Sequence, residues 1–271
     1  GATSVYVRYL FEMQHGDYVV SYDGSTREYL IGSLGEYRYD ESAFEEPSHV
    51  RSATWKGRVS RDDLSQSAKN SLNSLLTVFR VRDDVAAELI ALLEGRQPDP
   101  NSADRSDPEP EPDDPVELGQ IDERAQELVK DLVVALDPDQ MEELVAGVLR
   151  AMGYKTRVSP KGPDRGRDIM ASPDGLGLEH PRIIVEVKHR RGAMGSDVVR
   201  GLSGALTATD RGLFVSTGGF TREARYEADR ANPPIALLDI DELVRLLTEH
   251  YASTDAATKA LVPLQAVYWP I

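Results

Sequence analysis

The chain has 271 residues, enough for two modest domains, and its 40% hydrophobic and 28% charged residues are typical of a globular protein. It contains no cysteine, which excludes disulfides and thiolate metal sites. No apolar run approaches the roughly 18 residues that a membrane-spanning helix needs, so we expect a cytoplasmic protein with no membrane contact.

The net charge of −15 is unevenly distributed along the chain. Residues 98–117 hold one basic and eight acidic side chains, whereas residues 155–230 hold 14 basic and ten acidic ones. A polyanion responds to the local field rather than to the total charge. The acidic total therefore does not exclude nucleic acid as a partner.

Residues 1–97 are predicted to form a small β-rich domain. Alternating apolar and polar residues between turn signals predict strands at 18–22, 29–32, 37–39, 50–55 and 77–81, followed by a helix at 83–93. The chain begins with Gly1 and Ala2 rather than with a methionine, so we expect this domain to be truncated at its N-terminus.

An acidic, proline-rich segment at residues 98–120 follows this domain. It contains six prolines and almost no apolar side chain, so it buries too little surface to offset the entropy cost of ordering. We expect an extended, self-repelling linker.

Residues 121–254 are predicted to alternate helices and strands, ahead of a C-terminal extension at 255–271. Helical spacing of apolar residues predicts helices at 122–136 and 139–152, the second one capped by Asp139. The remaining elements are expected as strands at 155–159, 167–172, 182–190, 211–217 and 235–240 and as helices at 196–207, 221–231 and 241–251. This order, α-β-β-β-α-β-α-β-α, predicts an α/β sandwich.

Two neighbouring strands of this second domain carry the candidate chemistry. Asp168 opens one strand, and Glu186 and Lys188 lie on one face of the next, since side chains alternate along a strand. Two carboxylates and the backbone carbonyl of Val187 form an all-oxygen site that suits Mg²⁺. A lysine beside that ion can orient a water or stabilise charge on phosphorus, as phosphodiester hydrolysis requires.

The simpler interpretation of Glu-x-Lys is an ion pair on a solvated strand edge. Here the pair interrupts a strand of isoleucine and valine, where a charge is costly without a partner or a metal. The surrounding segment is also locally basic. We therefore favour a catalytic site over a structural pair.

Four motifs resemble the Mrr-like (type IV) restriction endonucleases, which have the PD-(D/E)xK nuclease fold. They follow one another in the family's order and spacing over residues 138–251, at 141–154, 164–169, 185–188 and 213–221. The resemblance implies a Mg²⁺-dependent endonuclease, with Mn²⁺ as a substitute, that cuts foreign or modified DNA, including methylated double-stranded DNA. Cutting both strands requires two active sites, so a homodimer is expected at least during cleavage.

Carried over position by position, the resemblance places the catalytic residues at Asp168, Glu186 and Lys188. Many members have glutamine where this chain has Glu186, and the carboxylate restores the general nuclease pattern. The family's helix carboxylate matches Glu143, which would reach the ion through a water. Asp164 is a further candidate ligand, although a role in shaping the loop before Gly166 is favoured.

A set of residues is expected to lie near DNA because they are basic or belong to an exposed strand-to-helix turn: Lys161, Arg165, Arg167, His189, Arg190, Arg191, Thr217, Gly218 and Gly219. The basic run from His189 to Arg191 could equally be a solvated strand end. The turn could equally serve only to begin the next helix, with Thr221 as its N-cap.

Residues 5–82 resemble the PUA- and EVE-related modules that precede some Mrr-like nucleases, which implies a reader of the DNA. Its candidate base-contacting residues are aromatic: Tyr18, Tyr22, Tyr37, Tyr39 and Trp55. Aromatic alternation in a small β domain is more often core packing. Two other functions stay open at this point, namely a nuclease for branched or damaged DNA in repair and a catalytically idle DNA-binding module.

Overall fold

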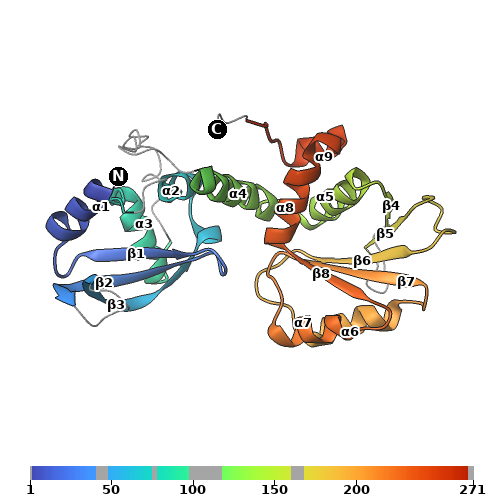
Figure 1. The fold of residues 1–271 in the computed structure, drawn as a ribbon, viewed down its shortest axis with the longest axis horizontal. Coiled ribbons are helices and arrows are strands. Elements are labelled where there is room, and N and C mark those ends of the chain that lie inside the picture. The colour runs from blue at the N-terminus through green and yellow to red at the C-terminus, as the bar shows by residue number, and fades with distance from the viewer. Residues whose placement is uncertain (1, 41–47, 75–77, 98–117, 160–167, 268–271) are drawn as a thin grey trace. The chain divides into compact units, whose positions relative to one another are not determined.

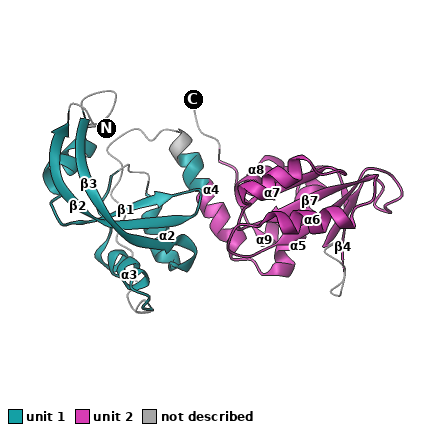
Figure 2. Ribbon diagram, turned by 90° about the horizontal axis from the view of Figure 1, so that it is seen from below, with its two compact units in different colours: residues 1–125 teal, residues 126–271 magenta. Residues whose placement is uncertain are grey.

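The computed structural model describes residues 2–40, 48–74, 78–97, 118–159 and 168–267. The chain divides into two compact units, Gly1–Ala125 and Gln126–Ile271 (Figure 2). Most of the predicted linker, residues 98–117, lies outside the described residues. Among the described residues, no helix has the length and apolar character needed to cross a membrane.

Unit 1 contains an antiparallel sheet in the order β1-β2-β3, formed by Tyr18–Asp23, Glu28–Asp40 and Ser48–Ser60 (Figure 1). The strands expected separately at 29–32 and 37–39 form the single strand β2. Irregular register between Ile31 and Gly32, and again between Leu34 and Tyr37, lets the pairing with β3 continue.

The helical segments of unit 1 are α1 (Ala2–Val7), a π-helical η1 (Arg8–Glu12), a 3₁₀ turn η2 (Arg61–Asp63), α2 (Gln66–Leu72) and α3 (Asp83–Leu93). The prediction of a strand at 77–81 is wrong for its described part, residues 78–81. There the carbonyl of Val78 accepts a hydrogen bond from the Arg8 guanidinium, at 2.8 Å, and forms no strand pairing.

The core of unit 1 lies between one face of its sheet and helices α2 and α3. Its buried residues are Tyr29, Ile31, Val59, Leu64, Ala68, Val85 and Leu89. Its three hairpin residues, Tyr29, Ile31 and Val59, lie in the half of the β2–β3 hairpin away from Tyr37 and Tyr39, which are not part of this core.

Unit 2 has a five-stranded sheet in the order β4-β5-β6-β7-β8. Its strands are Lys155–Val158, Ile169–Ser172, Arg182–Lys188, Asp210–Ser216 and Ile235–Asp239. The pairs β4–β5 and β5–β6 are antiparallel, whereas β6–β7 and β7–β8 are parallel. This topology is the α/β sandwich that was expected for a restriction-endonuclease-like fold, and an antiparallel sheet precedes it in the chain.

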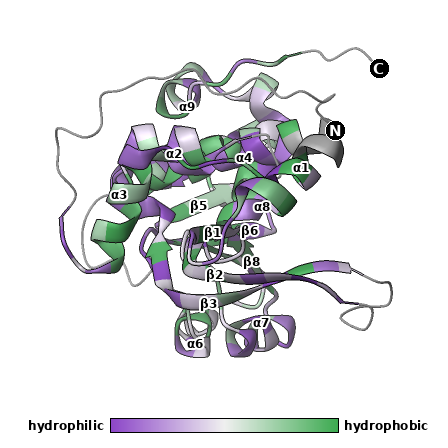
Figure 3. Ribbon diagram, turned by 90° about the vertical axis from the view of Figure 1, so that its left-hand side faces the viewer, coloured by the Kyte–Doolittle hydropathy of each residue, from purple (hydrophilic) through white to green (hydrophobic). Residues whose placement is uncertain are grey.

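Helices cover both faces of this sheet (Figure 1). Helices α5 (Pro138–Ala151) and α8 (Ile240–His250) pack on one face, and the end of α4 (Leu118–Val134) joins the same cluster. Helices α6 (Ser196–Ala205) and α7 (Arg222–Asp229) pack on the other face. Helix α7 is predominantly hydrophilic (Figure 3) and buries only Ala224 and Ala228.

Two details differ from the sequence-based expectation. Helix α5 begins at Pro138 and is capped by Asp137, which forms a capping box with Gln140, rather than by Asp139. Proline suits the first helical position because its missing N–H needs no partner there. The expected C-terminal extension contains a short helix, α9 (Ala256–Leu261), and it buries Val262 in the core of unit 2.

Candidate active site

Asp168 and Val187 join the beginning of β5 to the end of β6. Asp168 immediately precedes β5, and its N–H donates a hydrogen bond to the carbonyl of Val185 at 2.9 Å. In return, the N–H of Val187 donates to Oδ2 of Asp168 at 2.6 Å. The Asp168 carboxylate therefore lies against the backbone between Glu186 and Lys188.

The three predicted catalytic side chains share one side of the sheet. Val185 and Val187 pack in the cluster beneath α5 and α8, so the alternate residues of β6 face α6 and α7, as buried Ile184 does. Glu186 and Lys188 follow Ile184 in this alternation. Asp168 lies two positions before Met170, so the two side chains point to the same face of the sheet. Met170 packs against the same cluster as Ile184, and the carboxylate of Asp168 therefore lies on the side of α6 and α7 as well.

Lys188 and Glu186, which lie two positions apart on the same face of β6, form an ion pair. Nζ of Lys188 lies 2.9 Å from Oε1 of Glu186. The glutamate side chain is 13% exposed and the lysine side chain 35% exposed. The pair therefore presents its cation to solvent and keeps its carboxylate partly inside the unit.

Burial raises the pKa of Glu186 above its ordinary value. The hydrogen bond and charge of Lys188 act in the opposite direction, and the negative charge of Asp168 adds to the increase. The carboxylates of Asp168 and Glu186 thus repel each other at the end of β6. The positive charge of Lys188 does not fully compensate for the burial of Glu186.

This donor set fits a hard divalent cation. Mg²⁺ is bound in proteins through one or two carboxylates and keeps several waters, and a cation between Asp168 and Glu186 would relieve their repulsion. In a β-strand the N–H and the carbonyl of one residue point to the same neighbouring strand, so the Val187 carbonyl points to the same edge of β6 as its N–H, which faces Asp168. Among the described residues there is no group of three or more His, Cys, Asp and Glu side chains that could hold a metal, so these carboxylates would act with backbone and water oxygens.

The two acids at the beginning of α5 differ in burial. Glu143 is exposed, whereas Glu142 is half-buried, one helical turn before the buried residues Val145 and Ala146. Arg150, on the same side of the helix as Glu143, pairs with Asp255 at the beginning of α9. Glu142 is therefore the less exposed of the two acids, but α5 packs on the face of the sheet opposite to Ile184, so the expected role of Glu143 stays a prediction.

Two loops meet beyond the ends of β6 and β7. Met194 and Phe220 form a bridge in which the Met194 N–H donates to the carbonyl of Gly219 at 2.9 Å. A Cβ added at Gly218 would lie 2.4 Å from the carbonyl oxygen of Gly192 and 2.7 Å from that of Arg190. Only glycine permits this close approach, which brings the first turns of α6 and α7 together next to Lys188.

The residues expected near DNA fall into three groups. Arg190 and Arg191 are exposed in the first of these loops, and Thr217, Gly218 and Gly219 form the second. His189 differs from the expectation, because its half-buried ring is hydrogen-bonded through Nε2 to the carbonyl of Leu136 at 2.8 Å. The remaining candidates, Lys161, Arg165 and Arg167, lie outside the described residues, as do Asp164 and Gly166.

Ser216 is a polar residue of this region to which the sequence analysis gave no role. It is paired in register with Lys188, and its hydroxyl is buried without a hydrogen-bond partner among the described residues. The sequence feature that could have indicated Ser216 is its position directly after the apolar run Leu213–Val215. A buried hydroxyl without a partner is costly, and Ser216 is fully buried, so its hydroxyl is an unsatisfied polar group beneath the end of β7.

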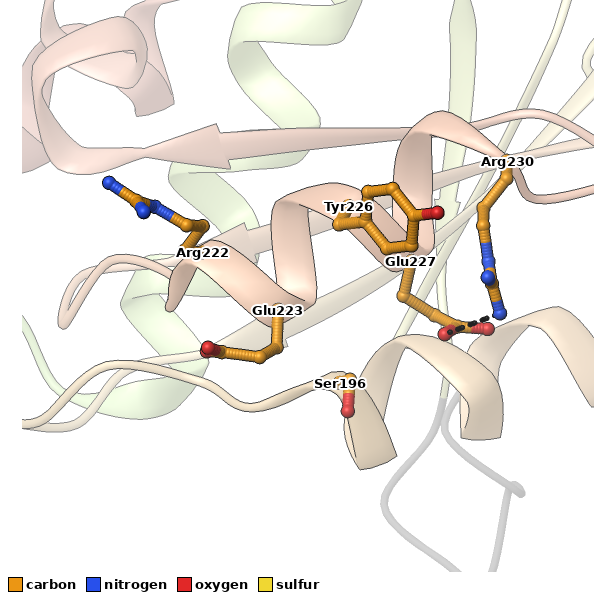
Figure 4. Close-up of a pocket in the computed structure, with 6 residues that line it drawn as sticks. All are labelled: Ser196, Arg222, Glu223, Tyr226, Glu227 and Arg230. Atoms are coloured by element: carbon orange, nitrogen blue, oxygen red, sulfur yellow. Dashed lines mark hydrogen bonds and ion pairs between the residues drawn. The ribbon is translucent and has the colours of Figure 1, made fainter.

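A shallow pocket of about 340 Å³ lies between the first residue of α6 and helix α7 (Figure 4). It is lined by Ser196, Arg222, Glu223, Tyr226, Glu227 and Arg230. Glu227 pairs with Arg230 at 3.4 Å and with Arg200 at 3.5 Å. None of the three predicted catalytic residues lines this pocket, and its acid–base pairing leaves little net charge to select a ligand.

The candidate reader residues of unit 1 do not share one environment. Tyr18, Tyr37, Tyr39 and Trp55 are exposed. Tyr22 instead packs against the core, with its ring centroid 4.8 Å from that of buried Tyr29. For Tyr22 the structure therefore agrees with core packing.

Part of the chain is similar to known proteins. Residues 133–247 match the model of the Mrr catalytic-domain family, which is described as a restriction endonuclease. The chain is 31% identical over 149 residues to the type IV methyl-directed restriction enzyme EcoKMrr of Escherichia coli (strain K12), covering 51% of this chain and 48% of that protein. The chain thus spans about half the length of the curated relative that it matches.

Two solved structures are similar at a lower level. The MspJI restriction endonuclease in complex with a 27-mer oligonucleotide has 12% identity and a TM-score of 0.39, covering 86% of this chain and 57% of that one. The DNA modification-dependent restriction endonuclease AspBHI has 15% identity and a TM-score of 0.40, covering 90% and 62%. Similarity at this level is too low to assign a role to any residue.

Proposed function

We propose that residues 133–247, which match the model of the Mrr catalytic-domain family, hydrolyse phosphodiester bonds of double-stranded DNA with a divalent metal ion. The observation that carries the proposal is the tie between Asp168 and the Val187 peptide, which places one carboxylate between Glu186 and Lys188. This arrangement supplies two acids for a cation and an amine beside them.

Each residue of the site has a separate task in this proposal. Asp168, Glu186 and the carbonyl of Val187 would hold Mg²⁺, with Mn²⁺ as a substitute. When bound, the ion supplies Lewis-acid chemistry that draws negative charge from the scissile phosphate. Lys188, held at 2.9 Å from Glu186 and partly exposed, orients the attacking water and offers a positive charge to the phosphate.

The surroundings of the site suit a phosphate backbone. Arg190 and Arg191 are exposed beside Lys188, and the loop at Thr217–Gly219 brings the first turn of α7 to the same edge of the sheet. Backbone amides at helix N-termini bind phosphate groups. These contacts recognise DNA without reading its sequence.

The proposed substrate is methylated or otherwise modified DNA, because the matched relative from Escherichia coli is a methyl-directed enzyme. A homodimer is proposed during cleavage, since each copy holds one candidate site and a double-strand cut requires two. Unit 1, on the same proposal, contacts the DNA and restricts which DNA is cut.

Cleavage of plasmid DNA tests the proposal. The parent protein and Asp168→Asn are incubated with methylated and with unmethylated plasmid, with and without Mg²⁺. We expect cleavage only by the parent, only with the ion, and faster on the methylated plasmid. Equal activity of the variant would reject the site, and metal-independent activity would reject the role of the ion. The same reactions are run on nicked and on branched DNA, and a preference for these substrates would identify a repair nuclease instead.

A further inference from the structure

Four aromatic rings meet at the outer half of the β2–β3 hairpin, in a group that we call the His49 cluster: Tyr6, Tyr37, Tyr39 and His49. The ring centroid of His49 lies 5.2 Å from that of Tyr39 and 5.9 Å from those of Tyr37 and Tyr6. The strand register places Tyr39 directly opposite His49, and Tyr37 opposite Arg51. Cross-strand pairing therefore builds most of the cluster, and α1 adds Tyr6.

These rings are not part of the hydrophobic core. Tyr6 is 52% exposed, Tyr39 55% and Tyr37 38%, and none of these rings belongs to the buried core of unit 1. Core packing, the usual reason for aromatic alternation in a strand, therefore does not account for them. Clustered rings on a surface commonly mark a binding site.

Hydrogen bonds and ring contacts order the cluster before any ligand arrives. The hydroxyl of Tyr37 lies 2.8 Å from Nδ1 of His49, and the two rings are nearly parallel, at 23°. Nε2, on the opposite edge of the imidazole, has no hydrogen-bond partner among the described residues. The cluster thus offers ring faces together with one polar edge.

A positive charge lies beside the rings. The Arg51 guanidinium is centred 5.6 Å from the ring of Tyr37 and donates to the backbone carbonyls of Met13, at 2.8 Å, and Tyr9, at 3.3 Å. In the described part of the chain no carboxylate pairs with Arg51. Strand β3 contains three basic residues and no acidic one, and two of the three acids of its partner β2 are paired, Glu28 with Arg58 and Asp40 with Arg38.

This combination selects one ligand chemistry. Exposed rings favour a flat aromatic group, and an uncompensated guanidinium favours an anion and disfavours an ammonium ion. A nucleotide combines a stacking base with a negatively charged phosphate. We infer that the His49 cluster binds an unpaired nucleobase of DNA by stacking, with Arg51 providing the charge that attracts its phosphate. This inference rests on the proposed function, which makes DNA the ligand.

Binding of a single-stranded probe tests the inference separately from catalysis. The full chain is titrated, without divalent metal, into fluorescein-labelled (dT)₁₂ and into an abasic 12-mer of the same charge, and anisotropy is recorded. We expect the parent to bind (dT)₁₂ more tightly than the abasic strand. Tyr39→Leu should bind (dT)₁₂ about five-fold more weakly or worse, whereas Tyr39→Phe should bind like the parent.

Tyr226→Leu is the matched control, because Tyr226 is 63% exposed and its ring contacts Arg230 rather than His49. Its affinity for (dT)₁₂ should equal that of the parent. Equal affinity of the parent for both probes, or equal weakening by Tyr226→Leu and Tyr39→Leu, would overturn the inference. The binding test contains no divalent metal, so its outcome is independent of cleavage. If the inference is overturned but the parent still cleaves plasmid, the proposed function stands. If the parent does not cleave plasmid but Tyr39→Leu weakens its binding of (dT)₁₂, only the inference about the His49 cluster is supported.

Discussion

The backbone N–H of Val187 donates a hydrogen bond of 2.6 Å to Oδ2 of Asp168, a residue 19 positions earlier in the chain. The bond holds one acid of the candidate site against the strand that carries the other acid and the lysine. A charged acceptor strengthens such a bond, so the tie both positions the carboxylate and stabilises the junction of β5 and β6.

Two substitutions of Asp168 should separate these roles. Asp168→Asn keeps an oxygen that can accept from Val187 but loses the charge, so we expect no Mg²⁺-dependent cleavage and a nearly unchanged melting temperature. Asp168→Ala loses the acceptor as well, and should be less stable by about 1 kcal/mol. Thermal unfolding together with plasmid cleavage measures both effects. A variant Asp168→Asn that cleaves at the parent's rate would contradict the assignment.

Glu186 is expected to lower the stability of the metal-free protein. Its carboxylate is largely buried beside Asp168, and burial raises its pKa. We therefore expect Glu186→Gln to unfold at a higher temperature than the parent without metal, and to lose the increase that Mg²⁺ gives the parent. Differential scanning fluorimetry with and without Mg²⁺ tests this. A variant stabilised by Mg²⁺ as strongly as the parent would exclude Glu186 as a ligand.

Much of unit 2 could be predicted from the sequence because its elements are long and strongly patterned. The apolar spacing of α5 and the alternation of Ile184, Glu186 and Lys188 depend on local periodicity, which a single sequence contains. Unit 1 was predicted less well. The strand expected at 77–81 is absent from its described residues because the Arg8 side chain, 70 positions away, accounts for the hydrogen bond at Val78.

The same distinction applies to the candidate site. The types and spacing of Asp168, Glu186 and Lys188 were visible in the sequence, whereas the half-burial of His189 against Leu136 was not. Nor could helical spacing alone decide between Glu142 and Glu143, since adjacent residues differ by about 100° around the helix and only the packing shows which one faces inward.

Gly218 should tolerate no side chain. A Cβ there would lie 2.4 Å from the carbonyl oxygen of Gly192, so Gly218→Ala must separate the two loops beside Lys188. We expect lower stability, by about 1–3 kcal/mol, together with slower cleavage. Gly201→Ala is the control, because a Cβ at this exposed position of α6 meets nothing within 4 Å and should stabilise the helix by about 0.5–1 kcal/mol. Urea unfolding of both variants is the measurement.

Asp255 should make the stability of unit 2 sensitive to acid. It caps α9 by accepting from the N–H and hydroxyl of Thr258 and pairs with Arg150, contacts that lower its pKa to about 2. A carboxyl whose pKa is lower in the folded state contributes stability above its unfolded value of 3.8, and this contribution is lost as the pH falls toward 2.

We therefore expect Asp255→Asn to be less stable than the parent at pH 6, and the difference to shrink steadily between pH 4 and pH 2. The side chain is 41% exposed, so solvent screening should keep the effect modest. Urea midpoints at pH 6, 4 and 3 test this, with Glu249→Gln as a control at an exposed acid of α8. A difference that stays constant over this range would show that the cap acts without its charge.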